Sequence, residues 1–194
     1  MSNQLFKNRR FTTATICTLA MLTALNVVLD RLVAFNAGPY RVGIGTLPLL
    51  LSGLLFGPIP GAIVGFTGDL IGALTLGNAP YNPLFCVTPI LMGVLPGLLR
   101  QLAWRNQKNP IGIAAACLPP YLFGSLVYTT VILSKLGYAP PLFTAAFWPV
   151  AAARALTYLI TYGICTAIIY LLIQSRVFNV LGIVPKVKGK ANSN

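Results

Sequence analysis

The stretch IGTLPLLLSGLLFGPIPGAIVGFTGDLIGALTL, residues 44–76, indicates what kind of protein this chain forms. Two apolar runs, residues 44–56 and 61–76, flank the sequence Gly57-Pro58-Ile59-Pro60. Glycine and proline clustered in this way favour a tight turn between two helices. The only charged residue of the stretch is Asp69. The pattern therefore predicts a hairpin of two apolar helices inside a membrane.

The rest of the chain has the same apolar character. Apolar residues make up 56% of the 194 residues and charged residues 8%, and the mean hydropathy is +0.78. In soluble domains about a quarter of the residues carry charge. Because about 20 residues cross a bilayer core of roughly 30 Å, the chain has room for about six spans. We predict an all-α membrane protein, a bundle of six transmembrane helices near residues 11–35, 44–56, 61–76, 84–104, 111–133 and 143–173.

Basic residues are distributed unequally between the two sides of this predicted bundle. Ten Lys and Arg residues fall on one side, and Arg31, Arg41 and Lys135 fall on the other. The richer side is expected to be cytoplasmic, which predicts a multi-pass plasma-membrane protein with both termini inside. The expected organisation is a basic N-terminus at 1–10, the transmembrane substrate-binding domain at 11–176 and a basic tail at 177–194. Topology then accounts for the net charge of +12, and we expect the lipid bilayer, not nucleic acid, as a partner.

The polar inventory excludes most catalytic chemistry. The chain has no His and no Glu, and its only acidic residues are Asp30 and Asp69. We therefore expect no histidine dyad, no paired carboxylates for general acid and base catalysis and no cluster of metal ligands. The chain also lacks the glycine-rich loop that binds nucleotide phosphates. We expect no enzyme activity, no metal and no cofactor.

Two charged residues inside predicted spans are candidate site residues. An ionised Asp69 that faced lipid would cost a few kcal/mol, so it is expected to face the bundle interior or a water-filled cavity. It forms either a helix-packing ion pair or part of a ligand-binding or coupling site. Arg154 is its most obvious charged counterpart. Arg154 is expected to pair with Asp69, to bind an anionic ligand through its planar guanidinium, or to extend to the outer interface.

Further candidates lie near the predicted outer ends of the spans. Asp30, Arg31 and Arg41 form either an interfacial charge cluster or part of a substrate entrance. Aromatic residues near span ends belong either to an interfacial belt or to a site where they stack on a flat ligand. The aromatic candidates for such a site are Tyr81, Phe85 and Tyr121.

Small residues recur at helical spacing, which allows close approach between helices. Ala20 and Ala24 lie on one face of the first span. Glycines repeat every four residues at 57, 61 and 65, at 68 and 72, and at 93 and 97. Such faces either pack within the bundle or dock against another membrane subunit.

Several of these segments together resemble a known family. They are the Ala20-x-x-x-Ala24 face, RVGIGTLP at residues 41–48, LLFGPIPGA at 54–62 and GDLIGA at 68–73. The chain resembles the substrate-binding S components of energy-coupling factor (ECF) vitamin transporters, and among them the folate-specific members. The resemblance covers most of the chain, from about residue 11 to residue 176.

The resemblance implies a six-helix bundle that captures a vitamin from outside and topples within the membrane to release it inside. It also implies partners, namely a transmembrane scaffold subunit and two ATP-binding cassette ATPases. The scaffold would be reached through Ala20 and Ala24. An ATPase partner fits the absence of a nucleotide motif in this sequence.

Ligand chemistry is compatible with folate. The pterin edge has adjacent donors that Asp69 can accept, and the acidic tail needs an arginine, for which Arg154, Arg41 and Arg31 are candidates. The alternatives within the family are a queuosine precursor, pantothenate and hydroxymethylpyrimidine. A deazaguanine has the donor edge without the tail, and pantothenate has the tail without the edge. An alternative outside the family is a stand-alone proton-coupled carrier that uses Asp69.

Overall fold

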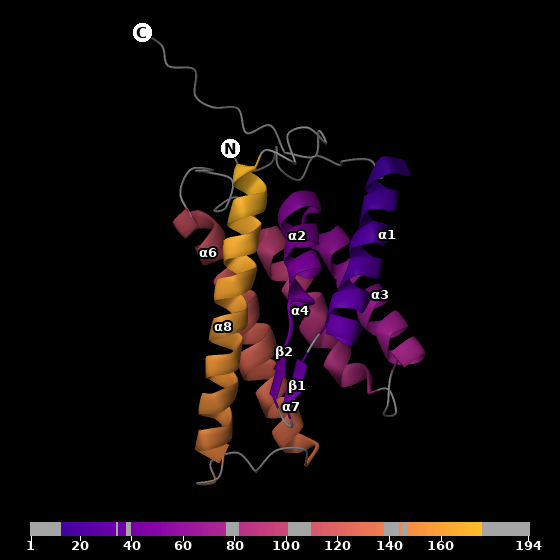
Figure 1. The fold of residues 1–194 in the computed structure, drawn as a ribbon. Coiled ribbons are helices and arrows are strands. Elements are labelled where there is room, and N and C mark those ends of the chain that lie inside the picture. The colour runs from indigo at the N-terminus through magenta and orange to yellow at the C-terminus, as the bar shows by residue number, and fades with distance from the viewer. Residues whose placement is uncertain are drawn as a thin grey trace.

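The computed structural model describes residues 13–33, 35–37, 40–76, 82–100, 110–137, 144 and 147–175. The predicted terminal segments, 1–10 and 177–194, lie outside these residues. Helices packed side by side form one bundle, and α1 begins at the end of the bundle where α8 ends (Figure 1). In chain order the elements are α1 (Thr13–Val28), the π-helix η1 (Leu29–Val33), β1 (Phe35–Ala37), β2 (Tyr40–Val42), α2 (Thr46–Phe56), α3 (Pro58–Leu76), the 3-10 helix η2 (Pro83–Cys86), α4 (Val87–Leu98), α6 (Pro110–Pro119), the π-helix η3 (Pro120–Thr129), α7 (Thr130–Lys135) and α8 (Phe147–Gln174).

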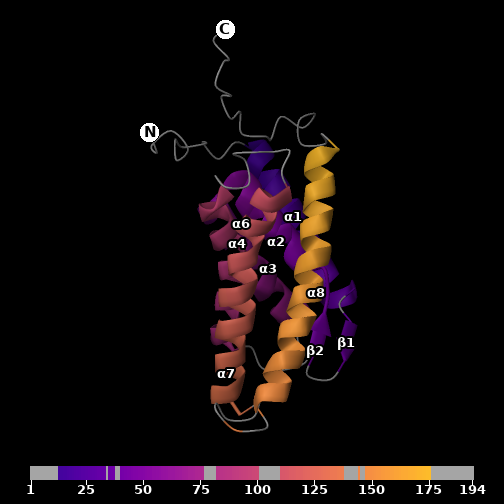
Figure 2. The same cartoon turned by 90° about the vertical axis from the view of Figure 1, so that its left-hand side faces the viewer.

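Four described segments are long and apolar enough to cross a membrane: Thr13–Arg31, Pro58–Thr75, Ile111–Lys135 and Phe147–Gln174. They correspond to four of the predicted spans, and the prediction of a helical, multi-pass membrane protein is confirmed. Two more apolar helices, Thr46–Phe56 and Pro83–Leu98, are shorter. The segment from α6 through η3 to α7 forms one continuous column beside α8 (Figure 2).

Helix α2 lies in the centre of the bundle. Residues 47–55 are all buried, as expected for a helix that is apolar on every side. Its 11 residues rise only about 16 Å, roughly half of a bilayer core. Side chains from α4, α6 and α8 complete the core around it, among them Met92, Ile113 and Ile169. The predicted span at 44–56 is therefore an internal helix of the bundle and too short to cross the bilayer by itself.

Glycines bring α2, α3 and α4 into backbone contact. Gly57 has φ 105°, a conformation that favours glycine, and it makes the turn from α2 to α3. A Cβ atom at Gly93 would overlap the carbonyl oxygen of Gly61, and a Cβ at Gly61 would overlap that of Gly93. Gly65 contacts Pro89 in the same way. Of the two alternatives for these glycines, packing within the bundle or docking against another membrane subunit, the structure shows the first.

A short hairpin departs from the helical pattern. The predicted loop at 36–41 contains an antiparallel pair in which Phe35 lies opposite Val42 and Ala37 opposite Tyr40. Strand β2 contacts α8, and Figure 2 shows the hairpin beside that helix. Extended backbone is possible here because the hairpin connects two helices and is not itself a span.

Candidate substrate-binding site

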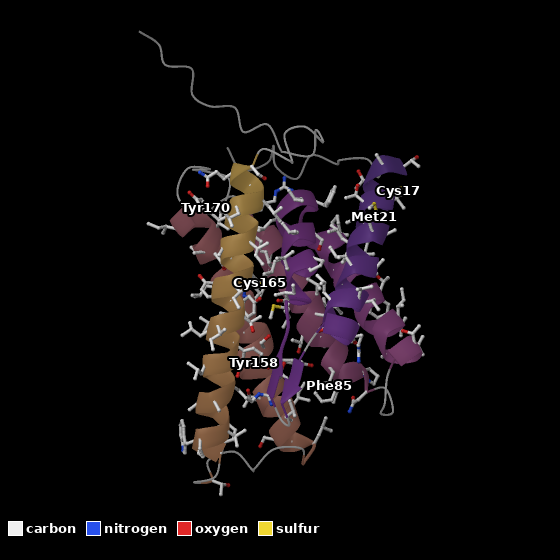
Figure 3. All side chains as sticks on the ribbon, in the orientation of Figure 1. Cys17, Met21, Phe85, Tyr158, Cys165 and Tyr170 are labelled. Carbon is white, nitrogen blue, oxygen red and sulfur yellow. The ribbon has the colours of Figure 1, made fainter. Side chains whose placement is uncertain are left out.

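A cavity of about 270 Å³ lies inside the bundle. Its walls come from α1, η1, α2 and α3, and from η2, α4, η3 and α8. Two of its lining residues, Phe85 and Tyr158, lie toward one end of the bundle, whereas Cys17 and Tyr170 lie toward the other end (Figure 3). The cavity is therefore in the half of the bundle away from the first residues of α1 and the last residues of α8.

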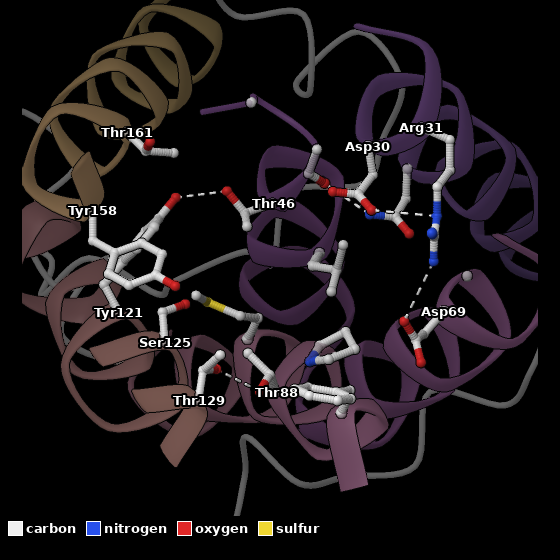
Figure 4. Close-up of a pocket in the computed structure, with 18 of the residues that line it drawn as sticks. Asp30, Arg31, Thr46, Asp69, Thr88, Tyr121, Ser125, Thr129, Tyr158 and Thr161 are labelled. Atoms are coloured by element: carbon white, nitrogen blue, oxygen red, sulfur yellow. Dashed lines mark hydrogen bonds and ion pairs between the residues drawn. The ribbon is translucent and has the colours of Figure 1, made fainter. Parts of the chain in front are cut away.

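One side of the cavity carries a cluster of opposite charges. The Arg31 Nε atom lies 3.7 Å from Asp30 Oδ2, and its Nη2 atom lies 4.0 Å from Asp69 Oδ1. All three side chains remain partly accessible, at 21%, 37% and 20% for Arg31, Asp30 and Asp69. Arg31 is thus a partner of Asp69 in this structure. Of the three alternatives for Arg154, the ion pair with Asp69 is not found among the described residues. Figure 4 shows the cluster on one side of the cavity.

Two glycines of α3 make room for this arrangement. A Cβ atom at Gly72 would lie 2.8 Å from Arg31 Nε, so the guanidinium lies directly on the α3 backbone. One turn earlier, the Asn26 side chain occupies the space beside Gly68. Asn26 also donates from Nδ2 to the carbonyl oxygen of Gly45, at 2.8 Å. The glycine pair therefore positions α1 and η1 against the helix turn that carries Asp69.

Arg154 lies on α8, on a different wall of the cavity. It is 8% exposed, so it does not extend to the interface. Its Nη2 atom donates to the Tyr158 hydroxyl at 3.0 Å, and the guanidinium carbon lies 5.9 Å from the centre of the Tyr158 ring. The Nε atom is buried without a hydrogen-bond partner among the described residues. A guanidinium in this environment is a favourable site for an anion.

Hydroxyl groups line the cavity between the charged groups. Thr46 Oγ1 and the Tyr121 hydroxyl lie 2.6 Å apart, and Thr88 Oγ1 lies 2.9 Å from Thr129 Oγ1. The Tyr121 ring packs edge-on against Tyr162, with ring centres 5.7 Å apart. Sequence reasoning missed most of these groups. The available signal was the presence of polar residues in apolar spans, namely Thr46, Thr88, Ser125, Thr129, Tyr158 and Thr161.

Most of the predicted site residues converge on this one cavity. Its lining includes Asp69, Arg31, Arg154, Phe85 and Tyr121. Arg41 belongs to β2, but its side chain is not among those described, and Tyr81 lies outside the described residues.

The two alanines predicted to dock a partner lie away from the cavity. Ala20 and Ala24 are exposed on α1, and neither lines the cavity. Exposed apolar side chains surround them, including Ile16, Met21 and Leu25. This face of α1 is therefore open to lipid or to another membrane protein.

Comparison with known proteins places these features in a family. The family model "ECF transporter, substrate-specific component" matches residues 14–182. The folate transporter FolT of Clostridium novyi is 30% identical over 80 residues, 41% of this chain and 46% of that protein. FolT of Streptococcus mutans is 25% identical over 158 residues, 78% of this chain and 80% of that protein. The alignment with the first relative thus spans less than half of its length.

The fold is similar to that of a solved structure, FolT bound with folic acid. The TM-score is 0.71 at 24% identity, over 84% of this chain and 95% of the other. The match of the family model extends from the start of α1 beyond the end of α8 and includes every wall of the cavity. This chain belongs to the substrate-specific components of ECF transporters.

Proposed function

We propose that this protein captures folate from outside the cell and delivers it inward together with a transmembrane scaffold subunit and two ATP-binding cassette ATPases. The observation that carries the proposal is the division of charge in the cavity. Two carboxylates lie at one wall and a buried arginine lies at another. Folate has a matching division, with a pterin at one end and an acidic tail at the other. The names of the relatives support this substrate.

Asp69 is assigned to the pterin. The pterin edge has adjacent N–H and amino donors, and a carboxylate can accept both of them. At 4.0 Å the contact with Arg31 is an ion pair longer than a hydrogen bond. Arg31 can therefore hold the carboxylate in place while the oxygens accept hydrogen bonds from a ligand. This assigns Arg31 to positioning Asp69 instead of binding the tail.

Arg154 is assigned to the acidic tail. Its side chain is buried, and within the described part of the chain it pairs with neither Asp30 nor Asp69 and its Nε donor is unused. A carboxylate would form charge-assisted hydrogen bonds with it. Arg41 remains the second candidate for the tail, because β2, which contains it, contacts α8. The aromatic rings of Phe85 and Tyr121, with Tyr81, are assigned to contacts with the flat parts of the ligand.

The proposed topology has six helices and both termini in the cytoplasm. The start of α1 and the end of α8 lie at the same end of the bundle (Figure 1), which supports termini on one side of the membrane. The excess of basic residues supports the cytoplasm as that side. Cysteines introduced at Lys108 and Lys188, in a background without the native cysteines, test this proposal. Both should react only with membrane-permeant reagents in intact cells. Labelling of one of them from outside would overturn the orientation.

The exposed alanine face is assigned to the scaffold subunit. Small side chains let helices approach closely, and Ala20 and Ala24 are not used for packing inside the bundle. ATP hydrolysis is assigned to the partner ATPases. Transport by the isolated protein, driven by protons alone, would contradict this division and favour the carrier alternative.

Ligand identity is tested with the purified protein. Bound small molecules are extracted and identified by mass spectrometry, and folate, pantothenate and a deazaguanine are then titrated. Folate should bind tightly and saturably, with one molecule for each protein chain. Tight binding of pantothenate or the deazaguanine without binding of folate would refute the substrate and leave the family assignment in place.

A further inference from the structure

Ser125 differs from every other hydroxyl residue of the cavity. Seven hydroxyl residues line it. Six of them have hydrogen-bond partners in the protein: Thr46 with Tyr121, Thr88 with Thr129, Tyr158 with Arg154 and Thr161 with its own helix. Ser125 is 5% exposed, and no hydrogen bond of its hydroxyl is found within the described ranges. The residue is buried but its hydroxyl borders the cavity, where a water or a ligand can supply the missing hydrogen bond.

Hydroxyl residues of the neighbouring helices bond to the backbone of their own helix, and Ser125 does not. In α8, Thr157 and Thr161 donate to the carbonyl oxygen four residues earlier, at 2.9 and 3.0 Å. In η3 the backbone follows a wider spiral, and Thr129 donates to Gly124, five residues earlier, at 3.0 Å. Ser125 makes neither kind of bond. Wide turns of this type occur frequently at functional sites.

The position of Ser125 indicates which part of a ligand it would contact. Its hydroxyl is directed into the cavity, on the side of Tyr121 and Tyr158 and across the cavity from Asp69 (Figure 4). A ligand whose donor edge is bound at Asp69 would extend its linker toward Ser125. The tail would then continue toward Arg154, which donates to Tyr158.

We propose that Ser125 is a specificity-determining residue whose hydroxyl donates a hydrogen bond to a carbonyl oxygen in the linker between the ring and the acidic tail of the ligand. The inference rests on the proposed function, because it takes folate as the ligand. It adds a third recognition point, a neutral one, between the carboxylate end and the arginine end. A linker without a carbonyl group would leave this hydroxyl unpaired, which disfavours its binding.

Folate affinity of the Ser125→Ala protein tests the proposal. The matched control is Ser52→Ala, because Ser52 is also buried but donates to Leu49 at 2.7 Å and does not line the cavity. Loss of one neutral hydrogen bond should weaken folate binding by about threefold to tenfold. The control should bind like the wild type. If Ser125→Ala does not fold, Ser125→Cys, a weaker donor of similar size, is measured in its place.

The variants also separate the inference from the function on which it rests. Wild-type protein that fails to bind folate overturns the proposed function and this inference together. Wild-type binding with an unchanged Kd in Ser125→Ala overturns the inference alone. In the double variant Ser125→Ala, Asp69→Asn, the increase in Kd should equal the product of the increases in the two single variants, because distant contacts contribute independently. If Ser125→Ala no longer raises the Kd for folate when Asp69→Asn is also present, the hydroxyl contacts the ring and not the linker, and the inference is overturned.

Discussion

Replacing Arg154 with methionine should change stability and binding in opposite directions. The side chain is 8% exposed, makes one hydrogen bond within the described structure, to Tyr158, and leaves Nε unpaired. A charged residue at the centre of a span costs about 2.5–3.5 kcal/mol on insertion scales. Removing it also forfeits the Tyr158 bond, about 1 kcal/mol. The unfolding free energy of the protein without ligand should therefore increase by about 1.5–2.5 kcal/mol, which raises Tm by about 3–10 °C at about 2–4 °C per kcal/mol.

Folate binding should become weaker in the same variant. Charge-assisted hydrogen bonds to a carboxylate contribute about 1.5–3 kcal/mol, which corresponds to a Kd about tenfold to 150-fold higher. Thermal unfolding without ligand and a folate titration measure the two effects on one preparation. Arg154→Lys is the matched control, because it keeps the charge but loses the planar fork. It should bind with intermediate affinity and show no rise in Tm.

The opposite pattern would refute this reasoning. A methionine variant that is less stable than wild type and binds folate equally well would show that Arg154 packs against Tyr158 and does not contact the ligand. A variant that loses both thermal stability and folate affinity would show that the guanidinium supports the shape of the cavity.

Three other changes test the remaining assignments. Asp69→Asn should weaken folate binding by about one to two orders of magnitude in a titration, because it removes a charged acceptor; an unchanged Kd with a lower Tm would make it a packing residue. Ala20→Leu combined with Ala24→Leu should abolish ATP-driven uptake in vesicles while binding stays within about twofold, and equal loss of both would contradict docking. Gly93→Ala should lower Tm by several degrees, at about 1–3 kcal/mol for overpacking. Gly163→Ala, whose Cβ meets nothing within 4 Å, should leave Tm unchanged or slightly higher.

The long spans were predictable because their signal is local. Runs of apolar residues long enough to cross a bilayer identified the segments that became α1, α3 and α8, and the column from α6 to α7. The Gly57 turn was also found, since glycine and proline act on their own neighbourhood. The short hairpin and the π-helices η1 and η3 were not predicted. Their formation depends on contacts between segments and leaves no periodic pattern in the sequence.

The site was predicted as a set of residues, but its pairing was not. The high cost of charge inside a membrane was enough to select Asp69 and Arg154. The ion pair that forms depends on the α1 and α3 packing, in which Gly72 leaves space for the Arg31 guanidinium. Arg31 is in η1, where a π-turn alters the direction of the side chain from that expected for an α-helix. From the sequence, Arg154 was one candidate partner of Asp69 because it is the other charged residue well inside a predicted span.

The resulting charge pattern distinguishes folate from its rivals. Among the described residues that line the cavity, two aspartates and two arginines carry a formal charge, and these charges cancel. Because Arg31 contacts both carboxylates, one wall has a net negative charge, whereas Arg154 leaves a positive charge on another. A deazaguanine would donate hydrogen bonds to the carboxylates of the negative wall and leave Arg154 buried without an anion. Pantothenate would place its carboxylate against Arg154 but has no donor edge for the carboxylates of the other wall. A ligand with donors at one end and an acid at the other supplies partners for both walls, and these interactions offset the cost of removing each charged group from water.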